Sequence, residues 1–274
     1  MSIEVELCQI AARLAREAGE LVAAGRRDAK VAAVKSSLVD IVTQMDVAAE
    51  ALLRERLAQL RPDDAIVGEE GDDAGGTSGV TWVVDPIDGT VNYLYGIEHY
   101  SVSVAAVTGG ADPLSWRALA GAVWDGSGVL WTAAAGHGAW RDGVVLRREP
   151  GGSLDQTLLA TGFQYVAERR AIQGQIVAQM LPQVRDIRRL GSASVDLCLV
   201  AAGIIDAYYE HGLHAWDFAA GALIAQEAGV TVAGIDGEPA NSHLLIAAVP
   251  GVWEPLRDAL EAAGARQPWD SPSR

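Results

Sequence analysis

Residues 82–90 read Trp82-Val83-Val84-Asp85-Pro86-Ile87-Asp88-Gly89-Thr90, a short apolar run followed by two acids, a proline and a glycine. The apolar run predicts a buried strand over 81–84, which delivers Asp85 at its carboxyl end. Proline has no N–H to donate to a neighbouring strand, so we expect Pro86 to end the ladder and to leave the Ile87 carbonyl free. The segment therefore predicts a tight turn, rich in oxygen atoms, at the end of a strand.

This turn collects the ligands that a hard divalent cation prefers. Asp85 and Asp88 supply carboxylates. Ile87 supplies a carbonyl oxygen and Thr90 a hydroxyl. In proteins Mg²⁺ accepts one or two carboxylates while it keeps waters and a substrate phosphate. Gly89-Thr90 is placed to open a helix, and the free amides at a helix start can meet a phosphate group.

Two other segments also place an acid at the end of an element. Ile66-Val67-Gly68-Glu69-Glu70 puts Glu69 after a short apolar strand, and Trp216-Asp217-Phe218 puts Asp217 at the start of a helix. These acids and the 85–88 turn could converge on one binuclear metal site. An ordinary structural role is the alternative, because Asp-Pro and Asp-Gly are common turn formers and an Asp at a helix start is usually a cap. Composition and spacing leave both readings open.

The overall composition indicates a globular enzyme. The chain has 274 residues, of which half are apolar, and it carries 30 glycines. A chain of this length can bury a substantial core in one large or two closely packed domains. Its formal net charge of −15 argues against nucleic acid as the main ligand, because two polyanions repel each other. Carboxylates that hold divalent cations would make the acidity compatible with an anionic substrate.

The thiols and the hydropathy pattern favour a cytoplasmic protein. Cys8 and Cys198 lie far apart among apolar neighbours, and two buried thiols are expected rather than a disulfide. Charged residues recur through 1–25, which therefore does not resemble a signal peptide. The sequence has no run of about eighteen apolar residues, so we expect no membrane span.

Helices and strands alternate along the whole chain. Apolar spacing predicts helices over 3–24 and 43–60, the second opened by a capping box of Thr43 with Asp46. Glu149-Pro150-Gly151-Gly152 is a plausible junction between two halves. We therefore expect an N-terminal α+β half over 1–148 with most of the metal ligands. The C-terminal α/β half over 149–274 would carry the substrate contacts and the last metal ligand.

Several motifs together resemble the inositol monophosphatase family. They are Asp85-Pro-Ile-Asp-Gly-Thr90 with Asn92, Gly68-Glu69-Glu70, Trp216-Asp217, the segment from Lys35-Ser36-Ser37 to Asp46, Gly191-Ser192-Ala193 and Asp206-Ala207-Tyr208-Tyr209-Glu210. The similarity covers nearly the whole chain and keeps the family's order. It implies the family's layered α/β/α/β/α sandwich. Departures are few: Tyr93 stands where many relatives have Phe, and Ser192 where relatives often have Thr.

The resemblance also implies a role for each matching residue. Glu69, Asp85 and the Ile87 carbonyl would hold a first Mg²⁺, and Asp85, Asp88 and Asp217 a second. A weaker third ion would face Glu69, with Asp46 near it through water. Catalysis would rest on Asp85 and on Glu69 and Thr90, which orient and help to deprotonate the attacking water. The substrate contacts would be Asp88, Asp217, the amides of Gly89 and Thr90, Ala193 and Glu210, with Lys35 at the edge of the site.

The activity implied is Mg²⁺-dependent hydrolysis of myo-inositol monophosphate to inositol and phosphate by metal-activated water, in a lithium-sensitive cytoplasmic homodimer. Two cations that clamp the attacking and leaving oxygens suit a phosphate monoester dianion, so no protein nucleophile is needed. Related phosphatases of histidinol phosphate, 3′-phosphoadenosine phosphate or fructose 1,6-bisphosphate share the metal ligands and stay as alternatives. A regulatory protein that binds RNA or polymerase on the same fold is the alternative outside enzymes.

Some of these residues also have plain structural explanations. Asp46 could serve only as the cap partner of Thr43, and Lys35 could be a solvated surface charge. Glu210 could be a strand-end acid that faces solvent. His211 and His214 suggest zinc, but they lack a nearby third ligand of the right type and are expected to be loop residues.

Overall fold

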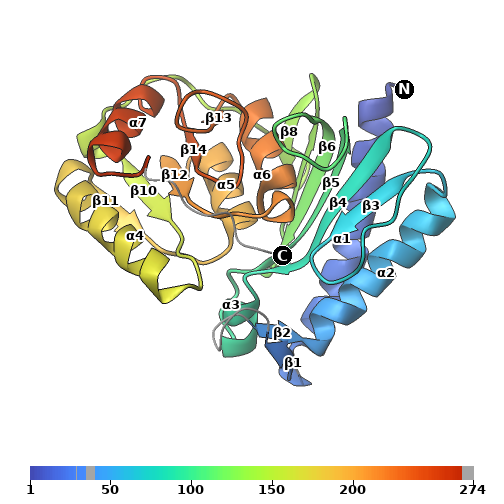
Figure 1. The fold of residues 1–274 in the computed structure, drawn as a ribbon. Coiled ribbons are helices and arrows are strands. Elements are labelled where there is room, and N and C mark those ends of the chain that lie inside the picture. The colour runs from blue at the N-terminus through green and yellow to red at the C-terminus, as the bar shows by residue number, and fades with distance from the viewer. Residues whose placement is uncertain (29, 35–40, 267–274) are drawn as a thin grey trace.

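The computed structural model describes residues 1–28, 30–34 and 41–266, and it stacks helices and sheets in five layers (Figure 1). The helices are α1 (Ile3–Gly25), α2 (Gln44–Leu60), α3 (Thr90–Tyr95), α4 (Ala167–Met180), α5 (Ala193–Ala202), α6 (Ala215–Glu227) and α7 (Trp253–Ala262). Helices α1 and α2 cover one face of a seven-stranded sheet, α5 and α6 lie between this sheet and a five-stranded one, and α4 and α7 cover the far face of the latter. The expected layered α/β/α/β/α sandwich is confirmed.

The seven-stranded sheet follows chain order. Its strands are β3 (Ala65–Gly68), β4 (Val80–Asp88), β5 (Ser101–Thr108), β6 (Arg117–Asp125), β7 (Leu130–Ala134), β8 (Gly138–Arg141) and β9 (Val144–Leu146). Strands β3 and β4 are parallel and all later pairs are antiparallel. Every residue of β4 is buried, because helices cover both faces of the sheet, and this explains its unbroken apolar run.

The five-stranded sheet has the order β11-β10-β12-β14-β13. These strands are β10 (Leu158–Thr161), β11 (Asp186–Arg188), β12 (Ala207–Glu210), β13 (Thr231–Ala233) and β14 (Leu245–Ala248). A separate antiparallel pair joins β1 (Val31–Val34) to β2 (Ile41–Thr43). Lys35 and the serines after it lie outside the described residues. The division of the chain near residue 148 falls between β9 and β10, and it stays a prediction.

Local contacts explain how the helices pack on the larger sheet. Tyr93 donates its hydroxyl to the Val22 carbonyl near the end of α1, at 2.8 Å, so the hydroxyl that relatives with Phe lack ties α3 to α1. A Cβ on Gly121 of β6 would stand 2.9 Å from the Ala220 Cα, so glycine here lets α6 approach the sheet closely. The thiols of Cys8 and Cys198 are both free and buried, as expected. None of the described helices combines the length and hydrophobicity that a membrane span requires.

Strand β4 does not end at Pro86, which corrects one expectation. Asp85 pairs with Ser103 and Asp88 pairs with Ser101, so β4 has one more residue than β5 between these two pairs. The ladder is interrupted by a bulge at Pro86 and Ile87 and then resumes. A bulge accommodates proline because the extra residue needs no partner for its missing N–H. It also places Asp85 and Asp88 on two sides of one local bend.

Candidate active site

Asp85 and Asp88 flank the bulge and are both buried. Asp85 Oδ1 accepts the Ile87 N–H at 3.0 Å, which fixes the bend from within. Asp88 Oδ2 accepts three hydrogen bonds from the first turn of α5: 2.7 Å from the Ser192 hydroxyl, and 2.8 and 2.6 Å from the Ser194 amide and hydroxyl. Both carboxylates are therefore oriented through one oxygen. Among the described residues no hydrogen bond reaches their other oxygens.

Thr90 begins α3 and points its hydroxyl at two acceptors. The Ile87 carbonyl lies 2.9 Å away and Asp46 Oδ1 lies 3.1 Å away. Since a hydroxyl has one proton, it can serve only one of them at a time. Asp46 Oδ2 in turn accepts the Thr43 N–H at 2.8 Å, so Asp46 completes the predicted capping box of α2 and also contacts Thr90. Gly89 precedes Thr90 with φ of 93°, a left-handed conformation that favours glycine.

Asp217 and Glu69 approach from other elements. Asp217 is the third residue of α6, and its Oδ2 accepts the His214 N–H at 2.7 Å, so it caps the helix as the plain structural reading predicted. Glu69 directly follows β3. The pKa of Asp85 lies well above its usual range. Burial is the largest cause, followed by repulsion from Glu69, Asp88, Asp217 and Asp46. The pKa of Asp217 is also raised well above its usual range, first by burial and then by repulsion from Asp88 and Glu69. These four predicted metal ligands thus share one electrostatic field.

Among the described residues 1–28, 30–34 and 41–266, which do not include Lys35, no ion pair reaches Asp85, Asp88 or Asp217. Buried carboxylates that repel one another and carry unused oxygens fit divalent cations, which accept oxygen ligands and supply the missing charge. As the side chains stand, no three acid, imidazole or thiol groups of the described chain close around a common ion position. The carboxylates of Asp85, Asp88 and Asp217 are each turned instead toward their own hydrogen-bond donors.

Glu210 lies at the end of β12, on the C-terminal side of this field. Its Oε2 accepts the Tyr208 hydroxyl, and burial raises its pKa to about 7. A Cβ on Gly162 would collide with this carboxylate, so glycine there leaves it room. Asp88 contributes to raising the pKa of Glu210, and Glu210 in turn contributes to raising the pKa of Asp217. Ala193, the other predicted substrate contact in this half, is the first residue of α5 and is buried.

Three contacts around the site were not predicted from the sequence. Ser194 was not singled out, although it gives Asp88 two of its three hydrogen bonds. His99 lies with Nε2 3.0 Å from Asp196 Oδ1. Glu50 accepts hydrogen bonds from two backbone N–H groups of the segment after Glu69. Only Glu50 left a sequence signal, since it lies four residues after Asp46 and hence on the same face of a helix.

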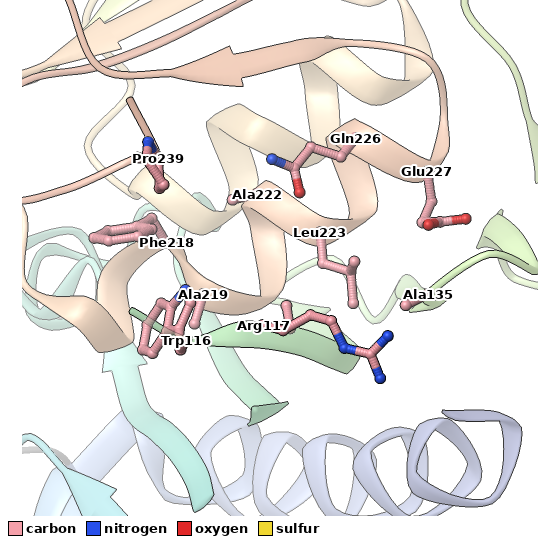
Figure 2. Close-up of a pocket in the computed structure, with 12 residues that line it drawn as sticks. Trp116, Arg117, Ala135, Phe218, Ala219, Ala222, Leu223, Gln226, Glu227 and Pro239 are labelled. Carbon is pink, nitrogen blue, oxygen red and sulfur yellow. The ribbon is translucent and has the colours of Figure 1, made fainter. Parts of the chain in front are cut away.

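A pocket of about 330 Å³ lies apart from these carboxylates (Figure 2). It opens between α6, the start of β6 and the loop before β14, with Trp116, Phe218 and Leu223 among its walls. Glu227 at its rim is already used, because it accepts the amides of Gly136 and Gly138 at 2.8 Å each. None of the predicted site residues lines this pocket.

Comparison with known proteins decides the family. A model described as "Inositol monophosphatase family" matches residues 4–267. The chain belongs to the inositol monophosphatase family. A curated inositol-1-monophosphatase from Mycobacterium leprae is 50% identical over 242 residues, which is 83% of this chain and 80% of that protein. The structure called Mycobacterium tuberculosis SuhB is 44% identical with a TM-score of 0.80, and covers 95% of this chain and 98% of its own.

The inositol monophosphatase assignment makes this chain a phosphatase and confirms the predicted enzyme class. A further relative from Escherichia coli (strain K12) carries a different name, "Nus factor SuhB". It is 40% identical over 236 residues, which is 84% of this chain and 86% of that protein. The family is generally metal-dependent, whereas the identity and number of the ions here stay predictions.

Proposed function

We propose that this phosphatase hydrolyses myo-inositol monophosphate to inositol and phosphate, with two Mg²⁺ ions and a weaker third one. The observation that carries the proposal is the shared field of Glu69, Asp85, Asp88 and Asp217, which three separate elements and a bulge bring together. No ion pair of the described residues reaches Asp85, Asp88 or Asp217. Acids that raise the pKa values of Asp85 and Asp217 cost stability unless something neutralises them. A fold that keeps such a cluster has a use for cations there.

The residues that would hold the ions follow from the donor set. Glu69, Asp85 and the Ile87 carbonyl would hold the first, and Asp85, Asp88 and Asp217 the second. When bound, the ions would supply positive charge to a phosphate dianion and lower the pKa of the attacking water. The unused oxygens of Asp85, Asp88 and Asp217 support this division, because one oxygen of each is already committed to orienting the group.

Thr90 and Glu69 would orient the attacking water and accept its proton. The Thr90 hydroxyl has two acceptors in reach, so it can donate a hydrogen bond to Asp46 or to the Ile87 carbonyl while it accepts one from a water. Burial raises the pKa of Asp46 to about 6, which makes it a usable proton acceptor near neutral pH. The amides of Gly89 and Thr90, at the start of α3, would bind phosphate oxygens.

The substrate preference rests on the C-terminal residues. Glu210 would accept hydrogen bonds from polyol hydroxyls, together with Asp217, and the segment at Ala193 would line the ring. The name inositol-1-monophosphatase, which the relative from Mycobacterium leprae carries, supports inositol 1-phosphate as the first substrate to try.

A phosphate-release assay over a panel of substrates, with Mg²⁺ and with a chelator, tests the proposal. The panel contains inositol 1-phosphate, histidinol phosphate, 3′-phosphoadenosine 5′-phosphate and fructose 1,6-bisphosphate. We expect Mg²⁺-dependent release that is fastest for inositol 1-phosphate. Faster hydrolysis of another substrate would overturn the substrate assignment, and full activity in chelator would overturn the metal assignment.

One observation favours a second candidate function. Relatives from Escherichia coli and Pasteurella multocida, 40% and 38% identical, are named Nus factor SuhB. A regulatory role in binding RNA or polymerase would be supported by binding that persists in chelator and at physiological salt. The net charge of −15 argues against RNA as a direct ligand. In such a regulatory role the chain would therefore bind a protein partner more readily than RNA.

The remaining expectations also stay proposals. A cytoplasmic homodimer inhibited by lithium is implied by the resemblance to the family. Lys35 would sit at the edge of the site, and its position lies outside the described residues.

A further inference from the structure

A buried carboxylate on α2, Glu50, binds the backbone directly after Glu69. Glu50 is 2% exposed. Its Oε2 accepts the Glu70 N–H at 2.7 Å and its Oε1 accepts the Gly71 N–H at 2.8 Å. Arg54, one turn further along α2, donates from Nε to Oε1 at 2.8 Å and balances the charge. Both oxygens of Glu50 are therefore occupied, and the group is not available as a metal ligand.

The loop is shaped to reach this carboxylate. A Cβ on Gly68 would stand 2.7 Å from Glu50 Oε1, and a Cβ on Gly71 would stand 2.8 Å from the same atom. Glycines on both sides of Glu69-Glu70 thus let the chain close on Glu50. Because a peptide unit is planar, fixing the Glu70 N–H also fixes the plane that contains the Cα of Glu69. Together with β3, which ends at Gly68 directly before Glu69, this plane limits the directions in which the Glu69 side chain can leave the backbone.

Helix α2 carries a second contact of the same kind. Asp46 accepts the Thr90 hydroxyl at 3.1 Å, and Asp46 and Glu50 are four residues apart on one face of α2. Side chains at this spacing have Cβ atoms about 5–6 Å apart. A single turn of a rigid helix therefore sets the spacing between the loop of Glu69 and the start of α3, where Thr90 lies.

We propose that Glu50 is a positioning residue, which with Arg54 holds the segment 69–71 so that Glu69 faces the metal site and Thr90. This inference rests on the proposed function. A purely structural role for Glu50 would change the stability of the fold and the amount of active enzyme. If Glu50 positions Glu69, its replacement must also change how tightly the enzyme binds Mg²⁺.

Two variants disturb the contact from opposite sides. Glu50→Gln keeps the shape of the side chain, but its amide has one acceptor oxygen for two N–H groups and turns its own NH₂ toward the other. Gly71→Ala leaves Glu50 intact and pushes a methyl group against Glu50 Oε1 and Arg54 Nε, each 2.8 Å from the new Cβ. The matched controls are Glu55→Gln, an exposed glutamate on the same helix, and Gly75→Ala, where a Cβ meets no atom within 4 Å.

The first readout is the Mg²⁺ concentration that gives half of the maximal activity, measured with KM and kcat at saturating Mg²⁺. The second needs no substrate: the midpoint of the rise in melting temperature as Mg²⁺ is added. We expect both midpoints to increase by about 10-fold in Glu50→Gln and Gly71→Ala, as is typical when a group that orients a metal ligand is lost. KM for the substrate stays unchanged, and both controls behave like the wild type.

Wild-type Mg²⁺ midpoints in Gly71→Ala would overturn the positioning role, and they would do so even if Glu50→Gln fails to fold. If the wild-type protein itself shows no Mg²⁺-dependent change in melting temperature or activity, the proposed function fails, and the positioning role fails with it. The two failures are distinguishable because only the first leaves a Mg²⁺-dependent wild-type enzyme.

Discussion

Ser194 donates both its backbone N–H and its hydroxyl to Oδ2 of Asp88, at 2.8 and 2.6 Å. Asp88 ends β4 and Ser194 lies in the first turn of α5, so the contact joins segments 106 residues apart in the chain. The N-terminal end of a helix also favours a negative charge. One oxygen of Asp88 is thereby fixed, and the orientation of the other is set by the layer between the two sheets.

Ser194→Ala tests whether this contact matters for the metal site. The variant loses one of three hydrogen bonds to Asp88 and keeps the amide and Ser192. We expect activity at limiting Mg²⁺ to fall by about 10-fold, with most of the loss recovered at high Mg²⁺. The free energy of unfolding should drop by about 1 kcal/mol. Ser115→Ala, at an exposed turn, is the control, and an unchanged Mg²⁺ dependence in Ser194→Ala would contradict this account.

Glu210→Gln separates recognition of the polyol from the chemistry. If Glu210 accepts hydrogen bonds from substrate hydroxyls, its loss should raise KM for inositol 1-phosphate by about 10-fold, since such charge-assisted bonds contribute about 1.5–3 kcal/mol. Hydrolysis of p-nitrophenyl phosphate, which has no polyol, should be unchanged. The exposed Glu149→Gln serves as the control. Equal losses with both substrates would show that Glu210 acts on the phosphate end instead.

His211 makes folding stability depend on pH. Its Nε2 donates to the Ala265 carbonyl at 2.9 Å, and burial lowers its pKa from 6.5 to about 4. Below pH 6.5 the unfolded chain binds a proton that the folded protein does not, so stability falls as the pH drops toward 4. From pH 7.5 to pH 5 we expect this site to cost about 2 kcal/mol.

Urea unfolding at these two pH values checks the prediction for His211. His211→Gln should lose about 2 kcal/mol less than the wild type over the interval. The exposed His137→Gln should lose as much as the wild type. An identical pH dependence in the wild type and in His211→Gln would show that the imidazole is not the responsible group.

The fold could be predicted from the sequence where local patterns dominate. The amphipathic stripe of α1 and the Thr43–Asp46 capping box of α2 both appear as expected. Strands β8 and β9 were not predicted, because they are only four and three residues long and the Asp142-Gly143 turn signal between them was not used. The bulge in β4 was also missed, because nothing in the sequence says whether a ladder resumes after proline.

The candidate site was predictable as a set of residue types, but not as a set of partners. Asp85, Asp88 and Asp217 stand out from their positions at element ends. Their orienting donors do not, because Ser194 and Asp88 come together only through the packing of α5 against the larger sheet. Glu50 shows the same limit. Its spacing from Asp46 placed it on one helix face, while its contact with the Glu69 segment depends on how α2 lies beside β3 and β4.

The most direct test of the account is the comparison of Asp85→Asn with the wild type, with Mg²⁺ and with a chelator. Asp85 lies at the centre of the shared field, so its replacement should reduce phosphate release from inositol 1-phosphate by at least about 100-fold. It should also abolish the Mg²⁺-dependent rise in melting temperature, and raise the melting temperature in chelator because one of the repelling charges is gone. Full Mg²⁺-dependent activity in Asp85→Asn would contradict the proposed metal site.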